Sequence, residues 1–328
     1  MQANMGMAGE FRCVVKRADG STKVDTGYQK NLILNQGLDF FGGGNGSNMM
    51  EYCVIGGGNS QPVYTQNKLD TALAGTNGSD ISTKYDYDAA RDGSLYKTNR
   101  VRKYSFTGLN NVNVSELGLA STYSNATTYF LCTRALIKDS LGNPTTITVL
   151  QGEILDIYYK LWAVYDTTDK TGTFNLLDGT GGSVAYNYKS KLAFVGKAFC
   201  YDSGYADYIV GAALKFMINN TSGHSINTFY TGELGSITGT ATNYLGDTPN
   251  GIQSLSNYAN GSYKRQMIIS IPASSINGNI RAMDMNTSMG SYQIRFGSVA
   301  NDSPITKTNT QKLSIPIEFS WGRYEGAL

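Results

Sequence analysis

Short runs of apolar and β-branched residues, separated by turn residues, recur along the whole chain. Residues 110–165 hold three or four such runs, rich in Val, Ile, Leu, Thr and Tyr and interrupted by Ser-Asn-Ala and Leu-Gly-Asn-Pro. Charged residues are few within these runs, and the side chains alternate, which is typical of strands that place one face in a core. The pattern predicts consecutive strands joined by tight turns.

The segments on either side add further predicted elements. Phe11 to Lys16 and Lys23 to Leu34 flank Ala18-Asp19-Gly20, which predicts a hairpin with Asp-Gly at its turn. The apolar spacing in KNLILNQGLDFF predicts one or two helical turns, which the following GGGNGS ends. Met49 to Ile55 is expected to form a strand. Four late strands are predicted at Gln266 to Ile271, Ile280 to Met285, Tyr292 to Phe296 and Leu313 to Tyr324.

The predicted fold class is all-β, with two antiparallel β-sandwich-like domains, long surface loops and little helix. A chain of 328 residues fits two such domains. Residues 1–165 form the predicted N-terminal domain, with a polar surface excursion around 59–99 that could lie on a neighbour. The polar, Gly- and Thr-rich segment 166–182 is the predicted linker. Residues 183–328 form the predicted C-terminal domain.

Composition narrows the classes of function. Charged residues make up only 16% of the chain and the net charge is +2, whereas a nucleic-acid binder normally has a clustered basic surface. The densest basic run, Arg100, Arg102 and Lys103, is short, so no nucleic-acid partner is expected. The 23 tyrosines favour strands and supply large contact areas with a polar tip, which suits extended, wet interfaces.

The cysteines and histidine give no sign of a metal or cofactor site. Cys13, Cys53, Cys132 and Cys200 form no Cys-x-x-Cys pair, and three lie in apolar runs, which favours buried thiols in a reducing compartment. A zinc site is not expected because His224 is the only histidine. No secretory leader or run of about 20 apolar residues is visible, so we expect no membrane partner and a soluble protein made in a cytoplasm.

Glycine-rich loops, nucleophiles and paired carboxylates are the sequence features that could carry catalysis. Neither Gly42–Gly46 nor Gly56–Gly58 has the Lys and helix of a phosphate-binding loop, and a serine triad lacks a suitable base. Glycoside hydrolysis needs only two carboxylates at a set separation. The available pairs are Asp86 with Asp88, Asp202 with Asp207, and Glu153 with Asp156. Solvated turn carboxylates, or a calcium ligand set, explain them better, so we predict no catalytic residues, no cofactor and no enzyme.

Two groups of aromatic residues are the predicted interaction residues: Tyr158, Tyr159, Trp162, Tyr165, Trp321 and Tyr324. In a strand over 154–165, Tyr158 and Trp162 share one face with Asp156, while Tyr159 and Tyr165 lie on the other. One face then belongs to the core and the other to an inter-subunit surface. A carbohydrate-stacking platform is the alternative. The apolar close of the chain predicts a terminal strand that is docked rather than frayed.

Several segments resemble structural proteins of tailed-bacteriophage virions. GYQKNLILNQGLDFF, from Gly27, is similar to a "-KNLITNQGLD-" pattern found early in many phage tail, collar and fibre proteins. Val114–Leu119, Arg134–Asp139 and Gly142–Leu150 are similar to a block that follows it. The close, from Ser288 to Tyr324, looks like the C-terminal part of such chains. The resemblance is global and implies an all-β neck, tail or appendage subunit with no enzymatic residues to carry over.

The resemblance also implies partners and location. We expect a homo-oligomer that contacts other virion proteins of the portal, neck or tail, and a chain made in the host cytoplasm and carried in the virion. The chain lacks a long fibre shaft, yet a receptor-binding appendage that recognises a host surface glycan is the second hypothesis. A depolymerase that uses paired carboxylates is the third. Copy number and symmetry do not follow from the sequence.

Overall fold

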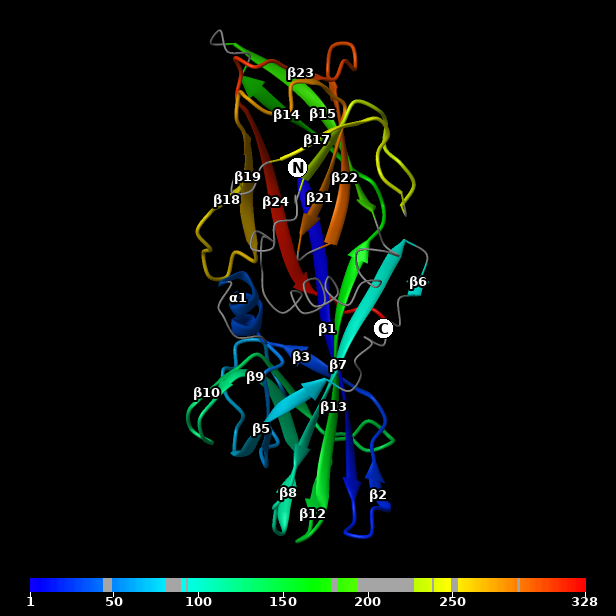
Figure 1. The fold of residues 1–328 in the computed structure, drawn as a ribbon. Coiled ribbons are helices and arrows are strands. Elements are labelled where there is room, and N and C mark those ends of the chain that lie inside the picture. Colours follow the sequence, from blue (N-terminus) through cyan, green and yellow to red (C-terminus); the bar gives the residue numbers. More distant parts are fainter. Residues whose placement is uncertain are drawn as a thin grey trace. The chain divides into compact units, whose positions relative to one another are not determined.

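The computed structural model describes residues 1–43, 49–80, 90–92, 94–177, 182–193, 227–237, 239–248, 253–287 and 290–328 (Figure 1). Strands make up 58% of the structure and helix 3%, which confirms the all-β prediction. The chain divides into two compact units. The barrel unit comprises Gly6–Ala89, Lys97–Val164 and Gly322–Leu328, and the sheet unit comprises Met1–Met5, Ala90–Tyr96 and Tyr165–Trp321.

The barrel unit is built on a closed, eight-stranded antiparallel barrel with the strand order β13-β7-β5-β4-β9-β11-β3-β1. Pairing of β1 with β13 closes it, in unbroken register from Gly6↔Val164 to Lys16↔Ile154. The barrel strands are β1 (Gln2–Lys16), β3 (Gln29–Ile33), β4 (Tyr52–Gly56), β5 (Ala72–Asp80), β7 (Leu95–Phe106), β9 (Glu116–Tyr123), β11 (Thr133–Leu136) and β13 (Ile154–Asp166).

Smaller elements decorate the barrel. They are β2 (Thr22–Asp25) beside β1, β10 (Tyr129–Leu131) beside β9, the paired strands β8 (Val112–Val114) and β12 (Ile147–Val149), and the helix α1 (Asn35–Gly43). The hairpin predicted at Asp19-Gly20 is confirmed, since Val15 pairs with Val24 and Gly20 has a φ of 83°. The predicted helical turns are confirmed as α1.

Two cores lie on the two faces of the barrel wall. Phe11 and Tyr159 face each other across β1 and β13 and are fully buried, whereas their neighbours Arg12 and Tyr158 are partly exposed, so the first pair faces the barrel interior. A second cluster covers the outer face of β4 and β9. Its buried members are Leu34, Val54, Leu69, Ala120, Tyr129 and Leu131.

The predicted surface excursion around 59–99 is wrong over much of its described length. Ala72–Asp80 forms β5, which pairs with β4 and β7 inside the barrel wall. Its sequence, ALAGTNGSD, lacks apolar alternation because its glycines make room for neighbouring aromatic rings. A Cβ on Gly75 would lie 2.5 Å from the ring of Tyr123, and one on Gly78 would lie 2.4 Å from Tyr104.

The sheet unit contains a six-stranded antiparallel sheet with the order β14-β15-β22-β21-β16-β17. Its strands are β14 (Lys170–Leu177), β15 (Ser183–Ala193), β16 (Asn227–Tyr230), β17 (Tyr244–Asp247), β21 (Ala282–Thr287) and β22 (Gly290–Ser298). A second group of strands runs β18 (Gln253–Leu255), β19 (Lys264–Ile271) and β24 (Leu313–Arg323), next to the first residues of β1. The short strands are β20 (Gly278–Ile280) with β23 (Ile305–Lys307), and β6 (Ala90–Asp92).

The division predicted from the sequence differs from these units in two ways. The predicted linker, 166–182, contains β14, which pairs with β15 over eight residues. The sheet unit also takes residues from the start of the chain and from 90–96. The description as two sandwiches is not confirmed, because the barrel unit is closed. Alternating strands fit either architecture, and only the β1–β13 pairing decides between them.

Candidate functional site

The aromatic residues of β13 divide between its two faces as the alternation predicts. Tyr159 is fully buried and Tyr165 is 1% exposed, so both are core residues. Trp162 is also buried, and its indole nitrogen donates a hydrogen bond to Glu10 Oε2 at 2.8 Å. Tyr158 is partly exposed, with the charged groups of Arg12 and Lys103 each 5.9 Å from its ring centre. Of these four residues, only Tyr158 presents its ring to the surface.

The two aromatic residues at the end of the chain have different settings. Trp321 is 5% exposed, and its ring lies 5.5 Å from that of Tyr258 in the sheet unit. Tyr324 is half-buried in the barrel unit, where its backbone N–H donates to Met7 O at 2.8 Å. The predicted docking of the terminal strand is confirmed, because β24 pairs with β19 over eight residues. Burial makes Trp321 a packing residue.

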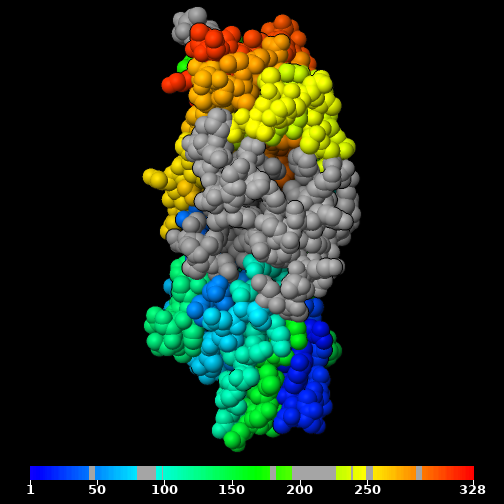
Figure 2. All heavy atoms as spheres, viewed as in Figure 1, coloured from blue at the N-terminus to red at the C-terminus, as the bar shows by residue number. Residues whose placement is uncertain are grey.

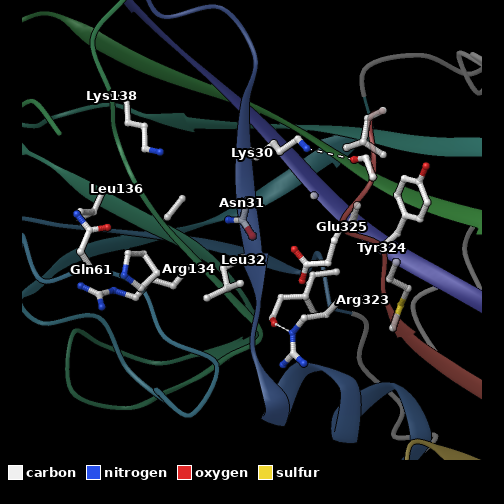
Figure 3. Close-up of a pocket in the computed structure, with 18 residues that line it drawn as sticks. Lys30, Asn31, Leu32, Gln61, Arg134, Leu136, Lys138, Arg323, Tyr324 and Glu325 are labelled. Atoms are coloured by element: carbon white, nitrogen blue, oxygen red, sulfur yellow. Dashed lines mark hydrogen bonds between the residues drawn. The ribbon is translucent and has the colours of Figure 1, made fainter. Parts of the chain in front are cut away.

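A cavity of about 240 Å³ lies where residues 323–328 cross the outside of the barrel wall; we call it the tail cavity (Figure 3). Figure 3 shows Lys138, Arg134 and Gln61 on one side of β3, and Arg323, Tyr324 and Glu325 on the other. Lys30, Asn31 and Leu32 of β3 lie between the two groups.

The cations around the tail cavity fix the tail. Arg323 donates from Nε to Ile33 O and from Nη2 to Asn35 Oδ1, both at 2.6 Å, and its guanidinium lies 4.1 Å from the ring centre of Tyr64. Lys30 Nζ donates to Gly326 O at 3.1 Å. The positive charges of Arg323 and Lys30 are therefore directed at protein oxygens and one aromatic ring. These contacts hold residues 323–328 against the barrel wall beside the cavity.

A buried ion cluster stands beside the cavity, on β9 and β11. Glu116 and Arg134 are both fully buried, and Glu116 Oε2 accepts from Arg134 Nε at 2.9 Å. Arg134 Nη2 also lies 2.8 Å from Asp70. The other oxygen of Glu116 accepts from the backbone N–H groups of Gly58 at 3.0 Å and Thr71 at 2.9 Å. Glu116 thus ties two connecting segments to the barrel wall.

This buried cluster was not predicted from the sequence. The available signal was one acidic and one basic residue, each inside an apolar strand, in VSELGLA and LCTRALI. A charge in such a run is seldom left unpaired when it is buried. Two opposite charges on neighbouring strands therefore indicate an internal ion pair.

The carboxylates proposed as a catalytic pair are each held by lysine. Glu153 lies 2.7 Å from Lys23 Nζ, and that hydrogen bond lowers the pKa of Glu153. Asp156 lies 3.0 Å from both Lys16 and Lys103. Burial alone would raise the pKa of Asp156, but hydrogen bonds from Ser105 and the two lysines lower it. The pairs Asp86 with Asp88 and Asp202 with Asp207 lie outside the described residues, as do His224 and Cys200.

One carboxyl group of the sheet unit, that of Asp284, has its pKa raised and not lowered. Asp284 is 3% exposed, accepts a hydrogen bond from Tyr230 Oη at 2.9 Å, and has its pKa raised to about 6 by burial. Its partner Tyr230 packs with Leu234 and Ala241 of the surface loop that follows β16, residues 231–237 and 239–243, shown in yellow in Figure 2. Gln293 anchors that loop by accepting from Gly235 N–H at 2.7 Å and donating to Gly239 O at 2.7 Å.

The most exposed aromatic ring described lies nearby on β17. Tyr244 is 64% exposed, and its ring packs edge-on against that of Tyr230 at 6.4 Å. Its hydroxyl donates to Asp247 Oδ2 at 3.1 Å. A fixed, exposed ring beside a carboxylate is an arrangement that can stack on a sugar ring. Tyr244 was not predicted as an interaction residue, because the polar sequence around it, ATNYLGDTPN, has no apolar alternation to indicate a strand.

A larger groove, of about 680 Å³, lies within the sheet unit; we call it the sheet groove. The β14–β15 hairpin lines one side, and strands β19, β23 and β24 line the other. Its apolar lining includes Leu176, Leu177, Val184, Ile268, Leu313 and Pro316. Leu177 is 85% exposed, Val184 39% and Ile268 36%, so apolar surface is open to solvent there.

The three described cysteines are buried, as the apolar runs around them predict. Cys13, Cys53 and Cys132 are buried free thiols, and burial raises the pKa of Cys132 to about 12. Among the described residues, no three His, Cys, Asp or Glu side chains are grouped to hold a metal ion. Within the same part of the chain, no helix is both long and apolar enough to span a membrane.

Comparison with known proteins gives no relative. No family model matches the chain, and neither a curated protein nor a solved structure matches it.

Proposed function

We propose that this chain is a structural subunit of a tailed-bacteriophage virion, at the neck, collar or tail. It acts by oligomeric assembly and by attachment to neighbouring virion proteins. The chain is made in the host cytoplasm and carried in the virion. No catalytic step, cofactor or nucleic-acid contact is part of the proposal.

The placement of the phage-like segments supports this role. The segment from Gly27 covers β3 and most of α1, and the next two segments cover much of β9 and β11. These strands are neighbours in the barrel wall, in the order β9-β11-β3. Glu116 and Arg134, which form the buried ion pair, belong to the same segments. Residues that build a wall in this way suit a scaffold better than a catalytic centre.

The observation that carries the proposal is the sheet groove. Apolar side chains that gather in one groove, rather than being scattered singly over the surface, can form a protein–protein contact. Here Leu177 and Val184 come from one strand pair and Ile268 from another, and all three are exposed at one groove. We further propose that the two groups of strands facing the groove form a sandwich. A neighbouring subunit would then cover its open side.

The test is to locate the chain in purified particles. We expect protein mass spectrometry of gradient-purified virions to detect it in several copies, and cryo-electron microscopy to place it with the symmetry of the neck or tail. A chain that is expressed during infection but absent from purified particles would refute the proposal. Activity against host polysaccharide, abolished by one Asp→Asn substitution, would also count against it.

A host-glycan-binding appendage is the second candidate, and Tyr244 is the observation that favours it. Its exposed ring and the neighbouring Asp247 could hold a sugar by stacking and hydrogen bonding. Glycan-array binding by the wild-type protein that is lost in Tyr244→Ala but kept in Tyr28→Ala would support this candidate. Tyr28 is a suitable control because it is also exposed, at 39%. If the wild-type protein binds no glycan on the array, the glycan-binding candidate is refuted.

A further inference from the structure

Strand β14 forms one edge of the six-stranded sheet. It pairs with β15 without a bulge, from Lys170↔Ser190 to Leu177↔Ser183. Among the described strands β15 is its only partner, and none of its eight residues is buried. Its second edge is therefore unpaired within the described part of the chain, and unpaired backbone N–H and C=O groups are a template for another strand.

This edge lacks the features that usually prevent strands from pairing between molecules. Thr171 to Leu177 contains no charged residue and no proline. Lys170, at the start, is drawn back toward the preceding turn, where its ammonium group bonds Asp166 and Thr168. Natural edges are normally short, charged, bulged or covered. By these criteria β14 is open.

Two other edge strands described in this unit, β17 and β18, are protected. β17 has only four residues, ends in Asp247, and pairs with β16 through an irregularity at Phe229/Tyr230. β18 has only three residues. The contrast within one unit indicates that the open edge of β14 has a partner in the assembled state.

We propose that the free edge of β14 pairs antiparallel with β14 of a second copy of this chain, across a two-fold axis at Thr173. This inference rests on the proposed assembly role and specifies one of its interfaces. Two six-stranded sheets would then continue into one another. A two-fold axis is the commonest symmetry of homo-oligomers, and it requires one surface to complement itself.

The sequence of β14 meets that requirement. Opposed residues of an antiparallel pair share a face of the sheet, so an axis at Thr173 sets threonine against threonine, a favourable cross-strand pair. It also sets Gly172 against Phe174, and Lys170 against Leu176. No like charges oppose each other. The apolar residues Leu176 and Leu177, which line the sheet groove, would be brought next to the partner copy.

The first experiment measures self-association of the purified full chain by sedimentation equilibrium. We expect a concentration-dependent dimer, and Thr173→Lys should raise its dissociation constant by about tenfold or more because two ammonium groups would meet at the axis. The control is Thr122→Lys, which makes the same change at an exposed strand position of the barrel unit. A monomer at every concentration, or equal effects of both variants, would overturn the proposal.

A cysteine variant tests the register independently of stability. Thr173→Cys should give a disulfide-linked dimer under diamide, because opposed Cα atoms lie about 5 Å apart, within disulfide range. Thr171→Cys, on the same face, should not, since its two copies would be about 13 Å apart. Cross-linking at Thr171 but not Thr173, or of Thr173 to a different protein, would overturn the proposed pairing.

The outcomes separate this inference from the virion role. A chain found in particles that neither self-associates nor cross-links at Thr173 would refute the β14 interface and leave the virion role standing. A Thr173-linked dimer of a chain that is absent from particles would support the β14 interface and refute the virion role.

Discussion

The buried ion pair between Glu116 and Arg134 gives the sharpest test of how the barrel unit is stabilised. Glu116→Gln keeps the size of the side chain and removes its charge. The remaining amide oxygen can still accept from Gly58 and Thr71, but the amide nitrogen then faces donors on Arg134. Among the described residues, Asp70 is then the charged partner that remains for the buried Arg134.

The size of the effect follows from burial. Both side chains of the pair are 0% exposed, and removing one partner of a buried ion pair costs about 3–5 kcal/mol. The control is Asp25→Asn, which breaks the pair with Arg12, whose side chains are 39% and 36% exposed. An exposed pair contributes only about 0–1 kcal/mol. The two variants should therefore differ by at least about 2 kcal/mol.

The assay is urea unfolding followed by the fluorescence of Trp162, in a Trp321→Phe background so that the signal comes from the barrel unit alone. We also expect Glu116→Gln with Arg134→Met to cost less than the sum of the single variants, because the second change removes the buried unpaired cation. A cost below about 1 kcal/mol for Glu116→Gln, equal to that of Asp25→Asn, would refute this reasoning.

Three further outcomes follow from single contacts. Gly9→Ala should lower the urea midpoint of the barrel, since its Cβ would lie 2.1 Å from Tyr159 Oη, and Tyr159→Phe should restore part of the loss. Asp284→Asn should stabilise the sheet unit above pH 6 by up to about 3 kcal/mol in thermal melts. The reason is that burial raises the pKa of Asp284 to about 6, so the charged form destabilises the folded state. This gain should vanish as the pH falls through about 4, where Asp284 is protonated in the folded and unfolded states alike. Lys307→Met should speed hydrogen exchange around 272–277, because Lys307 Nζ donates to Ala273 O, Ser275 O and Asn277 Oδ1. Unchanged midpoints, a pH-independent difference or unchanged exchange would contradict the respective arguments.

Local features of the fold could be predicted from the sequence because local chemistry determines them. The Asp19-Gly20 turn, the short α1 and the late strands β19, β22 and β24 appear close to their predicted positions. Each depends on residues within a few positions of one another, through turn preference or apolar alternation. The buried and surface faces of β13 also follow from alternation alone.

Closure of the barrel could not be predicted in this way. It depends on pairing Gly6 with Val164 and Lys16 with Ile154, residues far apart in the chain. Strand β5 was not predicted because its glycines leave space for the rings of Tyr104 and Tyr123, which lie on other strands. The exposed groups on which the functional proposals depend, Leu177 and Tyr244, share this difficulty, since exposure is a property of the folded chain.

The most direct test of the central claim is a symmetric cryo-electron microscopy reconstruction of purified particles, with the chain identified by its density. We predict several symmetry-related copies in the neck or tail, each with the open side of its sheet groove covered by a neighbouring subunit. Particles that lack the chain, or that carry it with the groove facing solvent in every copy, would contradict it.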